Sequence, residues 1–224
     1  MPAIDAADGS IDDQNPSEAE LLDTDCGLPE IRVSDRHRQV QAAAFALLLE
    51  VGEPLTREKI MVRAGSSEAE VAELLADFDA AGRVRFDEGG RVVGIAGLSL
   101  QPTRHRLQLG DTTRWTWCAL DAIGILGALG RDATFTTVVP DSDQELTVEF
   151  TAAGPQDTDA VVFMADGYGS DSVVETWCPT VNLFPDSATA NTWAAEHGVT
   201  GNAIPVADLA KDAAAMWAPV TGVA

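Results

Sequence analysis

Residues 115–130 read WTWCALDAIGILGALG, a run of apolar and small residues in which Asp121 carries the one charge. Apolar positions from Cys118 onward recur at helical spacing over two turns, and Gly130 follows the last of them. A helix that is apolar on every side is a buried helix. We therefore predict a buried helix in this stretch, inside a core that mixes helices and strands.

The remainder of residues 98–224 supplies the partners of this helix. Short segments of alternating or β-branched residues are typical of strands, and two capped apolar segments are typical of helices. The predicted strands are 98–109, 133–139, 145–150, 160–164, 181–184 and 203–205, and the predicted helices are 187–197 and 206–217. We expect an α+β core domain with an antiparallel or mixed sheet over residues 98–224.

Residues 34–97 have a different pattern, with three helices followed by a β-hairpin. The helices are expected after the capping residues Ser34 and Thr56 and over 68–81, and the strands over 83–86 and 91–95. This order is that of a winged-helix domain. Its later helix begins with the acidic segment SEAEVAE at 67–73, where DNA recognition needs arginine or lysine. We therefore predict a winged-helix-like packing domain that does not bind DNA.

The charge balance excludes several classes of partner. The 224 residues include 36 acidic and 14 basic side chains, for a net charge of −22. Such a chain repels nucleic acid and anionic membranes, and we expect it to bind neither. Lys59 and Lys211 are its only lysines, and the acidic excess predicts a protein adapted to high internal salt. Activity without added salt would contradict that interpretation.

The N-terminal residues 1–33 are rich in Asp, Glu, Ser and Pro, which predicts a disordered acidic tail. The first ten residues lack the basic and apolar regions of a secretory signal, and no apolar stretch approaches the roughly 18 residues of a membrane span. The sequence therefore predicts a soluble, cytoplasmic protein.

Three cysteines, Cys26, Cys118 and Cys178, are too few for a disulfide scaffold. Cys118 and Asp121 lie three residues apart at a helix start, so their side chains leave on one face. A helix N-terminus favours a thiolate, whereas a carboxyl group among apolar residues resists ionisation and can hold a proton. Spacing alone favours the other interpretation, a small buried cysteine beside an aspartate that caps the helix.

Other common chemistry is not indicated. The sequence has no C-x-x-C pair, no phosphate-binding glycine loop and no G-x-S-x-G motif. The three histidines, His37, His105 and His197, are isolated from one another and from the cysteines, and we predict that they lie at the surface.

Two segments resemble the organomercurial lyase family, also called alkylmercury lyases. Residues 114–121, RWTWCALD, are similar to the family's W-C-A-L-D signature. Residues 177–197, WCPTVNLFPDSATANTWAAEH, are similar without gaps to its second cysteine segment. Residues 95–100 lie where the family passes from a winged-helix-like region into its core, so the resemblance covers about 34–217.

The resemblance implies protonolysis of the carbon–mercury bond of a small organomercurial. Cys118 and Cys178 would bind mercury, and Asp121 would deliver the proton to carbon. No cofactor is implied; Hg(II) stays bound as product, an exogenous thiol assists its release, and a mercuric reductase is the implied acceptor. Three aromatic residues are expected either to exclude water and receive the organic group or to be ordinary core residues: Trp115, Trp117 and Phe184.

The chain departs from the family pattern at several positions. Pro179 stands where many members have a second adjacent cysteine, and Val139 replaces a further non-catalytic cysteine. Thr180 and Asn182 replace histidines near the second cysteine. Cys26 has no counterpart and is interpreted either as an idle thiol or as a ligand that delivers metal.

Three alternatives stay open from the sequence. The first is a non-enzymatic protein that binds or carries a soft metal such as mercury or Cu(I) through Cys118 and Cys178. The second is a metal-responsive winged-helix regulator, which the acidic surface disfavours. The third is a structural disulfide between the same two cysteines, which a cytoplasmic location disfavours.

Overall fold

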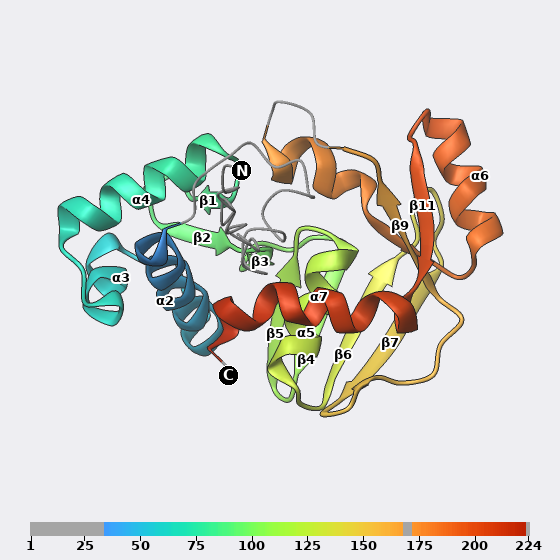
Figure 1. Ribbon diagram of the computed structural model, residues 1–224, viewed down its shortest axis with the longest axis horizontal. Helices are drawn as coiled ribbons and strands as arrows, with labels where there is room; N and C mark the ends of the chain where they lie inside the picture. The colour runs from blue at the N-terminus through green and yellow to red at the C-terminus, as the bar shows by residue number, and fades with distance from the viewer. Residues whose placement is uncertain (1–33, 168–171, 223–224) are drawn as a thin grey trace, which may run out of the picture.

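A computed structural model describes residues 34–167 and 172–222 (Figure 1). The predicted acidic tail and Cys26 lie outside the described residues. Within the described residues the fold is α+β and its strands pair antiparallel throughout, as expected. None of the described helices is long and apolar enough to cross a membrane.

Three helices come first and lie together at one end of the molecule (Figure 1). Each begins at a serine or threonine whose hydroxyl accepts a backbone N–H of the first turn, which satisfies one of the free donors at the helix start. The first two end at glycines in the left-handed conformation. The helices are α2 (Asp35–Val51), α3 (Arg57–Ala64) and α4 (Glu68–Ala80).

An eight-stranded sheet runs through the molecule in the order β1-β2-β3-β5-β4-β6-β7-β8. The hairpin β1–β2 that follows α4 therefore continues into the strands of the core. The strands are β1 (Val84–Phe86), β2 (Val92–Ile95), β3 (Leu98–Ser99), β4 (His105–Leu109), β5 (Thr112–Thr116), β6 (Ala133–Val138), β7 (Glu145–Thr151) and β8 (Gly154–Pro155).

A second, three-stranded sheet has the order β10-β9-β11. It comprises β9 (Val161–Ala165), β10 (Asn182–Phe184) and β11 (Gly201–Pro205), and α6 (Ser187–His197) lies against it (Figure 1). A π-helical turn over Val173–Trp177 and a 3-10 turn over Cys178–Thr180 precede β10.

The predicted buried helix is confirmed as α5 (Ala119–Leu129), in which residues 119–126 are all buried. The C-terminal helix α7 (Val206–Thr221) packs against α5 and reaches α2 (Figure 1). Close packing of α5 and α7 depends on glycines of α5, because a Cβ at Gly124 would clash with Trp217 and one at Gly127 would press on Ala214.

Two predicted boundaries were wrong. The single strand expected over 98–109 is divided into β3 and β4, with Pro102, which cannot donate to a ladder, between them. The apolar stretch from Trp115 is not helical at its start, because Trp115 and Thr116 belong to β5, which pairs with both β3 and β4. Local apolar content cannot separate a buried strand end from a buried helix start.

The prediction of three surface histidines was also wrong, since only His197 is exposed. His37 is 8% exposed and His105 is 2% exposed. The Nδ1 atom of His105 lies 2.9 Å from the hydroxyl of Thr137 on the next strand. Burial, with a smaller contribution from the charge of Arg104, lowers the pKa of His105 to about 3.

The buried imidazole predicts a specific loss of stability in acid. His105 is neutral in the folded protein, whereas in the unfolded chain it takes up a proton below its ordinary pKa of about 6.5. Its contribution is therefore complete above about pH 6.5 and declines as the pH falls toward 3, by at most about 1.4 kcal/mol per pH unit. In urea titrations, His105→Gln should lose less stability than the parent between pH 6.5 and 4.5. His197→Gln, at an exposed histidine, is the control, and a pH-independent difference between parent and His105→Gln would contradict the assignment.

Candidate active site

The first turn of α5 holds the predicted cysteine and aspartate in mutual contact. Cys118 is the N-cap residue, and its backbone N–H donates to Oδ2 of Asp121 at 2.9 Å. In return the N–H of Asp121 donates to Sγ of Cys118 at 3.5 Å. This is a reciprocal capping box, with sulfur in the place usually taken by a serine or threonine hydroxyl. Asp121 therefore both completes the helix cap and lies beside the Cys118 thiol.

The second cysteine reaches this turn through the backbone that follows it. The N–H of Ala119 donates to the carbonyl of Val181 at 3.1 Å, and the N–H of Val181 donates to the carbonyl of Cys178 at 3.2 Å. The start of α5 is thereby bonded to the turn that carries Cys178. Trp177 fixes the other side of that turn, since its indole N–H donates to the carbonyl of Ala165 on β9 at 3.1 Å.

Two side chains near Cys178, those of Thr180 and Asn182, brace the same turn. The hydroxyl of Thr180 donates to the carbonyl of Trp177 at 2.7 Å, and the Asn182 side-chain amide donates to the carbonyl of Pro179 at 2.8 Å. Asn182 is 1% exposed. Both side chains thus hold local backbone around the cysteine.

The structure brings together all three residues predicted for the site. One ligand atom each from Cys118, Asp121 and Cys178 lie within 4.8 Å of one another, and all three residues are buried. Both cysteines are free thiols rather than a disulfide. Two sulfurs and one carboxylate oxygen at such separations form a group that could hold one soft cation.

Burial controls the protonation of these groups. The pKa of the Cys118 thiol lies well above its ordinary value because the sulfur is desolvated, hydrogen-bonded to Cys178 and beside the Asp121 carboxyl group. Desolvation of the buried sulfur therefore opposes the thiolate form that a helix N-terminus favours. Burial also raises the pKa of Asp121 to about 6, although its hydrogen bonds with Cys118 act in the opposite direction. This agrees with the predicted resistance of the carboxyl group to ionisation.

A tight turn between β2 and β3 covers the aspartate, and sequence reasoning did not identify it as part of the site. Gly97 has φ +82°, and a Cβ there would overlap the Asp121 carboxyl group. The carbonyl of Gly97 accepts the N–H of Trp117 at 3.0 Å. The only sequence signal was an Ala-Gly pair between two short apolar strands.

The three aromatic residues expected around the site are dispersed. Trp117 packs against Gly94, where a Cβ would lie 3.2 Å from its indole ring. Trp115 on β5 is paired with Arg106 on β4, so the two side chains lie on the same face of the sheet. Leu107, the next residue along β4, lies on the opposite face, in the core that contains α5. Phe184 belongs to a separate apolar cluster on the face of β10 opposite Leu183. Strand alternation therefore turns two of the three away from the face that the thiols share.

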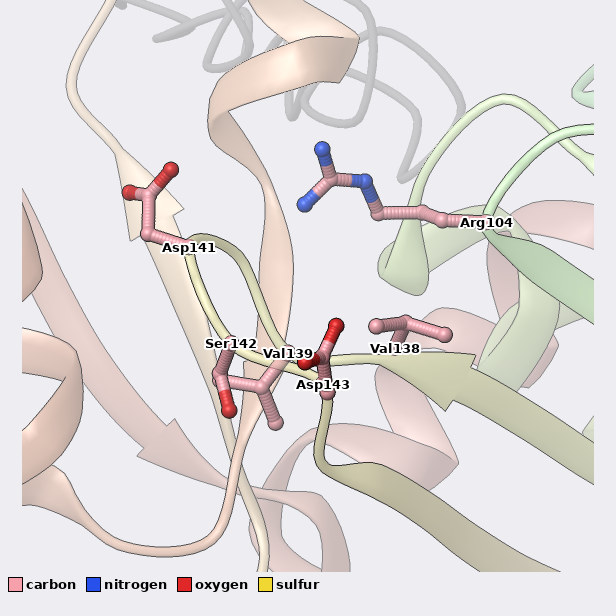
Figure 2. A pocket seen from close by; sticks show the side chains of 6 residues that line it. All are labelled: Arg104, Val138, Val139, Asp141, Ser142 and Asp143. Atoms are coloured by element: carbon pink, nitrogen blue, oxygen red, sulfur yellow. The ribbon is translucent and has the colours of Figure 1, made fainter.

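A pocket of about 450 Å³ lies elsewhere, beside the turn between β6 and β7. Figure 2 shows the Arg104 guanidinium reaching across it toward the turn that carries Asp141. The lining residues are Arg104, Val138, Val139, Asp141, Ser142 and Asp143, and none has a thiol. The pocket therefore offers no sulfur ligand to a soft metal.

Two free thiols and one carboxyl group meet at one buried point of an antiparallel α+β fold, and such a site could hold a soft metal ion. The family model for MerB, alkylmercury lyase, matches residues 98–218. The chain belongs to the alkylmercury lyase family.

Two relatives and one solved structure illustrate the similarity. The alkylmercury lyase of Streptomyces lividans is 32% identical over 166 residues, covering 72% of this chain and 74% of the relative. That of Staphylococcus epidermidis is 30% identical over 164 residues, with coverage of 72% and 74%. The mercury-bound form of MerB2 has the same fold, with a TM-score of 0.70, 15% identity, and coverage of 84% of this chain and 100% of that one.

The contact between the β2–β3 turn and Asp121 predicts that one added methyl group at Gly97 lowers the stability of the protein by an unusual amount. Gly97→Ala should destabilise the protein more than Gly110→Ala, because both positions have positive φ but a Cβ at Gly110 meets no atom within 4 Å. We expect about 1 kcal/mol for Gly110→Ala and at least about twice that for Gly97→Ala. Urea unfolding measures both. Equal losses would show that the carboxyl group does not lie against the turn.

Proposed function

We propose that this protein cleaves the carbon–mercury bond of small organomercurials by protonolysis, using Cys118, Asp121 and Cys178. The observation that carries the proposal is that two free thiols and one carboxyl group meet within 4.8 Å in a buried site. Membership of the alkylmercury lyase family supports the same reaction.

Substrate binding follows from the softness of the metal. An organomercurial carried on a small thiol, R–Hg–SR′, exchanges that thiol for a protein sulfur, because thiolates bind mercury better than oxygen ligands do. The proton of the first protein thiol leaves with the carrier as R′SH. Burial raises the pKa of the Cys118 thiol, and a thiol becomes acidic when it coordinates a metal, so Cys118 gives up its proton when it binds mercury.

Proton transfer then separates carbon from mercury. When the second cysteine binds mercury, its proton passes to the Asp121 carboxylate. Asp121 delivers this proton to the carbon atom, which takes the electron pair of the breaking carbon–mercury bond and leaves as R–H. The sum is R–Hg–SR′ plus two protein thiols giving R–H, R′SH and Hg(II) bound by two protein thiolates.

Asp121 suits this step by position and by acidity. It is fixed against Cys118 by the capping hydrogen bonds, and its pKa of about 6 lies close to neutral pH. A group whose pKa is near the working pH both accepts and donates a proton readily.

Product release needs a competing soft ligand, since two buried sulfurs hold the ion. We propose that an exogenous thiol withdraws Hg(II) and that a mercuric reductase receives it. No resident cofactor is needed, because the protein's own thiols and carboxyl group supply every step.

The N-terminal region has a packing role in this proposal, as a winged-helix-like unit that does not read DNA. The Arg114 guanidinium on β5 donates from Nε to the carbonyl of Leu48 at 2.9 Å and from Nη2 to that of Leu49 at 2.7 Å. These bonds tie the last turn of α2 to the core strand that leads to Cys118. The first turn of α4 carries Glu68 and Glu70, which would repel phosphate.

Substitutions at the three site residues test the proposal. Asp121→Ala should lower kcat for benzene release from phenylmercury by at least about 100-fold and still bind one Hg(II), because proton delivery is lost and the sulfurs remain. Cys118→Ser and Cys178→Ser should lose both tight mercury binding and turnover. Gas chromatography measures benzene, and mercury bound after gel filtration measures binding.

The control is Asp212→Ala, which removes an exposed carboxyl group of α7 and should change neither quantity. Normal benzene release by any of the three site variants would remove that residue from the mechanism. If the parent protein binds phenylmercury stoichiometrically and releases no benzene, it is a carrier rather than a lyase.

A further inference from the structure

A tryptophan on α7 contacts the active-site helix and the turn over the aspartate together. The indole N–H of Trp217 donates to the carbonyl of Ala96 at 2.9 Å. Its six-membered ring lies against Gly124 of α5, where a Cβ would overlap ring atoms. The helix that carries Trp217 packs against α5 (Figure 1). Trp217 therefore joins the C-terminal helix to the elements that build the site.

The turn held by Trp217 has an unfavourable backbone. Ala96 and Gly97 both have positive φ, +50° and +82°, between the paired residues Ile95 and Leu98. Two successive residues with positive φ form the type of turn that matches the twist of a hairpin, and asparagine or glycine is usual at its first position. Alanine at position 96 is strained there, since L residues with a Cβ rarely adopt this region. The hydrogen bond from Trp217 supports a conformation that Ala96 alone disfavours.

The same turn limits where the aspartate can lie. Gly97 packs so closely on the Asp121 carboxyl group that no side chain fits between them, and the Gly97 carbonyl accepts the Trp117 N–H. Asp121 is thus enclosed by the turn on one side and by Cys118 on the other. A shift of the turn would release the carboxyl group from the position in which it meets both sulfurs.

We propose that Trp217 is a positioning residue for the lyase reaction: its indole N–H holds the Ala96–Gly97 turn against Asp121 and so keeps the carboxyl group beside the cysteine pair. The inference rests on the proposed function, because it concerns the group that delivers the proton. Small displacements of a reacting group have large kinetic effects, of the order of 100-fold for about 1 Å. Mercury binding needs the sulfurs rather than the carboxyl position and should be much less sensitive.

Trp217→Phe tests the proposal, because it keeps a ring against Gly124 and removes only the N–H donor. We expect kcat for benzene release from phenylmercury to fall about tenfold or more, while KM and the binding of one Hg(II) stay within about twofold. Ala96→Gly in the same variant should restore most of the lost kcat, since glycine adopts the turn conformation without the hydrogen bond. A generally weakened fold would not be rescued in this way.

Trp193→Phe is the matched control. The Trp193 indole N–H also donates, to Asp141 Oδ2 at 3.0 Å, but it belongs to the separate apolar cluster under α6, and its loss should leave kcat unchanged. An unchanged kcat in Trp217→Phe would overturn the positioning role, as would a loss of kcat and mercury binding together that Ala96→Gly does not repair. A parent protein that releases no benzene would instead overturn the proposed function, and this inference with it.

Discussion

One backbone hydrogen bond, from the N–H of Ala119 to the carbonyl of Val181, joins the two segments that carry the thiols. On one side it satisfies a free donor of the first turn of α5; on the other it fixes the backbone just after Cys178. The remaining geometry of the site follows from this junction. The capping box orients Cys118 and Asp121, and the bonds of Thr180 and Asn182 shape the turn around the second cysteine.

Burial of the site around this junction sets the protonation of Cys118 and Asp121. Because the site is desolvated, the resting thiol of Cys118 keeps its proton and the carboxyl group of Asp121 ionises with difficulty. A hard cation gains little from two sulfur ligands and one carboxylate, whereas a soft cation binds sulfur strongly enough to displace a thiol proton. The proton that mercury displaces is released beside the group that would carry it to carbon, so binding and bond cleavage are linked by one proton.

Local patterns predicted much of this arrangement. The caps and glycine ends located α2 and α3, the apolar run located α5, and the three-residue spacing placed Cys118 beside Asp121. Spacing alone did not bring Cys178 to them; the resemblance of both cysteine segments to one family did. The errors concern long-range contacts: the strand role of Trp115, the orientation of Phe184 and the burial of His105 depend on sheet neighbours far along the chain. Gly97 and Trp217 were missed for the same reason, since their importance arises only when the β2–β3 turn meets α5 and α7.

The claim that two protein sulfurs bind one mercury atom is tested most directly by mercury L3-edge X-ray absorption of the protein loaded with one equivalent of Hg(II). Cys26→Ser removes the one thiol that lies outside the described residues from the measurement. We expect two sulfur neighbours at bonding distance in this protein and one after the further change Cys178→Ser. A single sulfur neighbour in both samples, or two that persist after Cys178 is replaced, would contradict it.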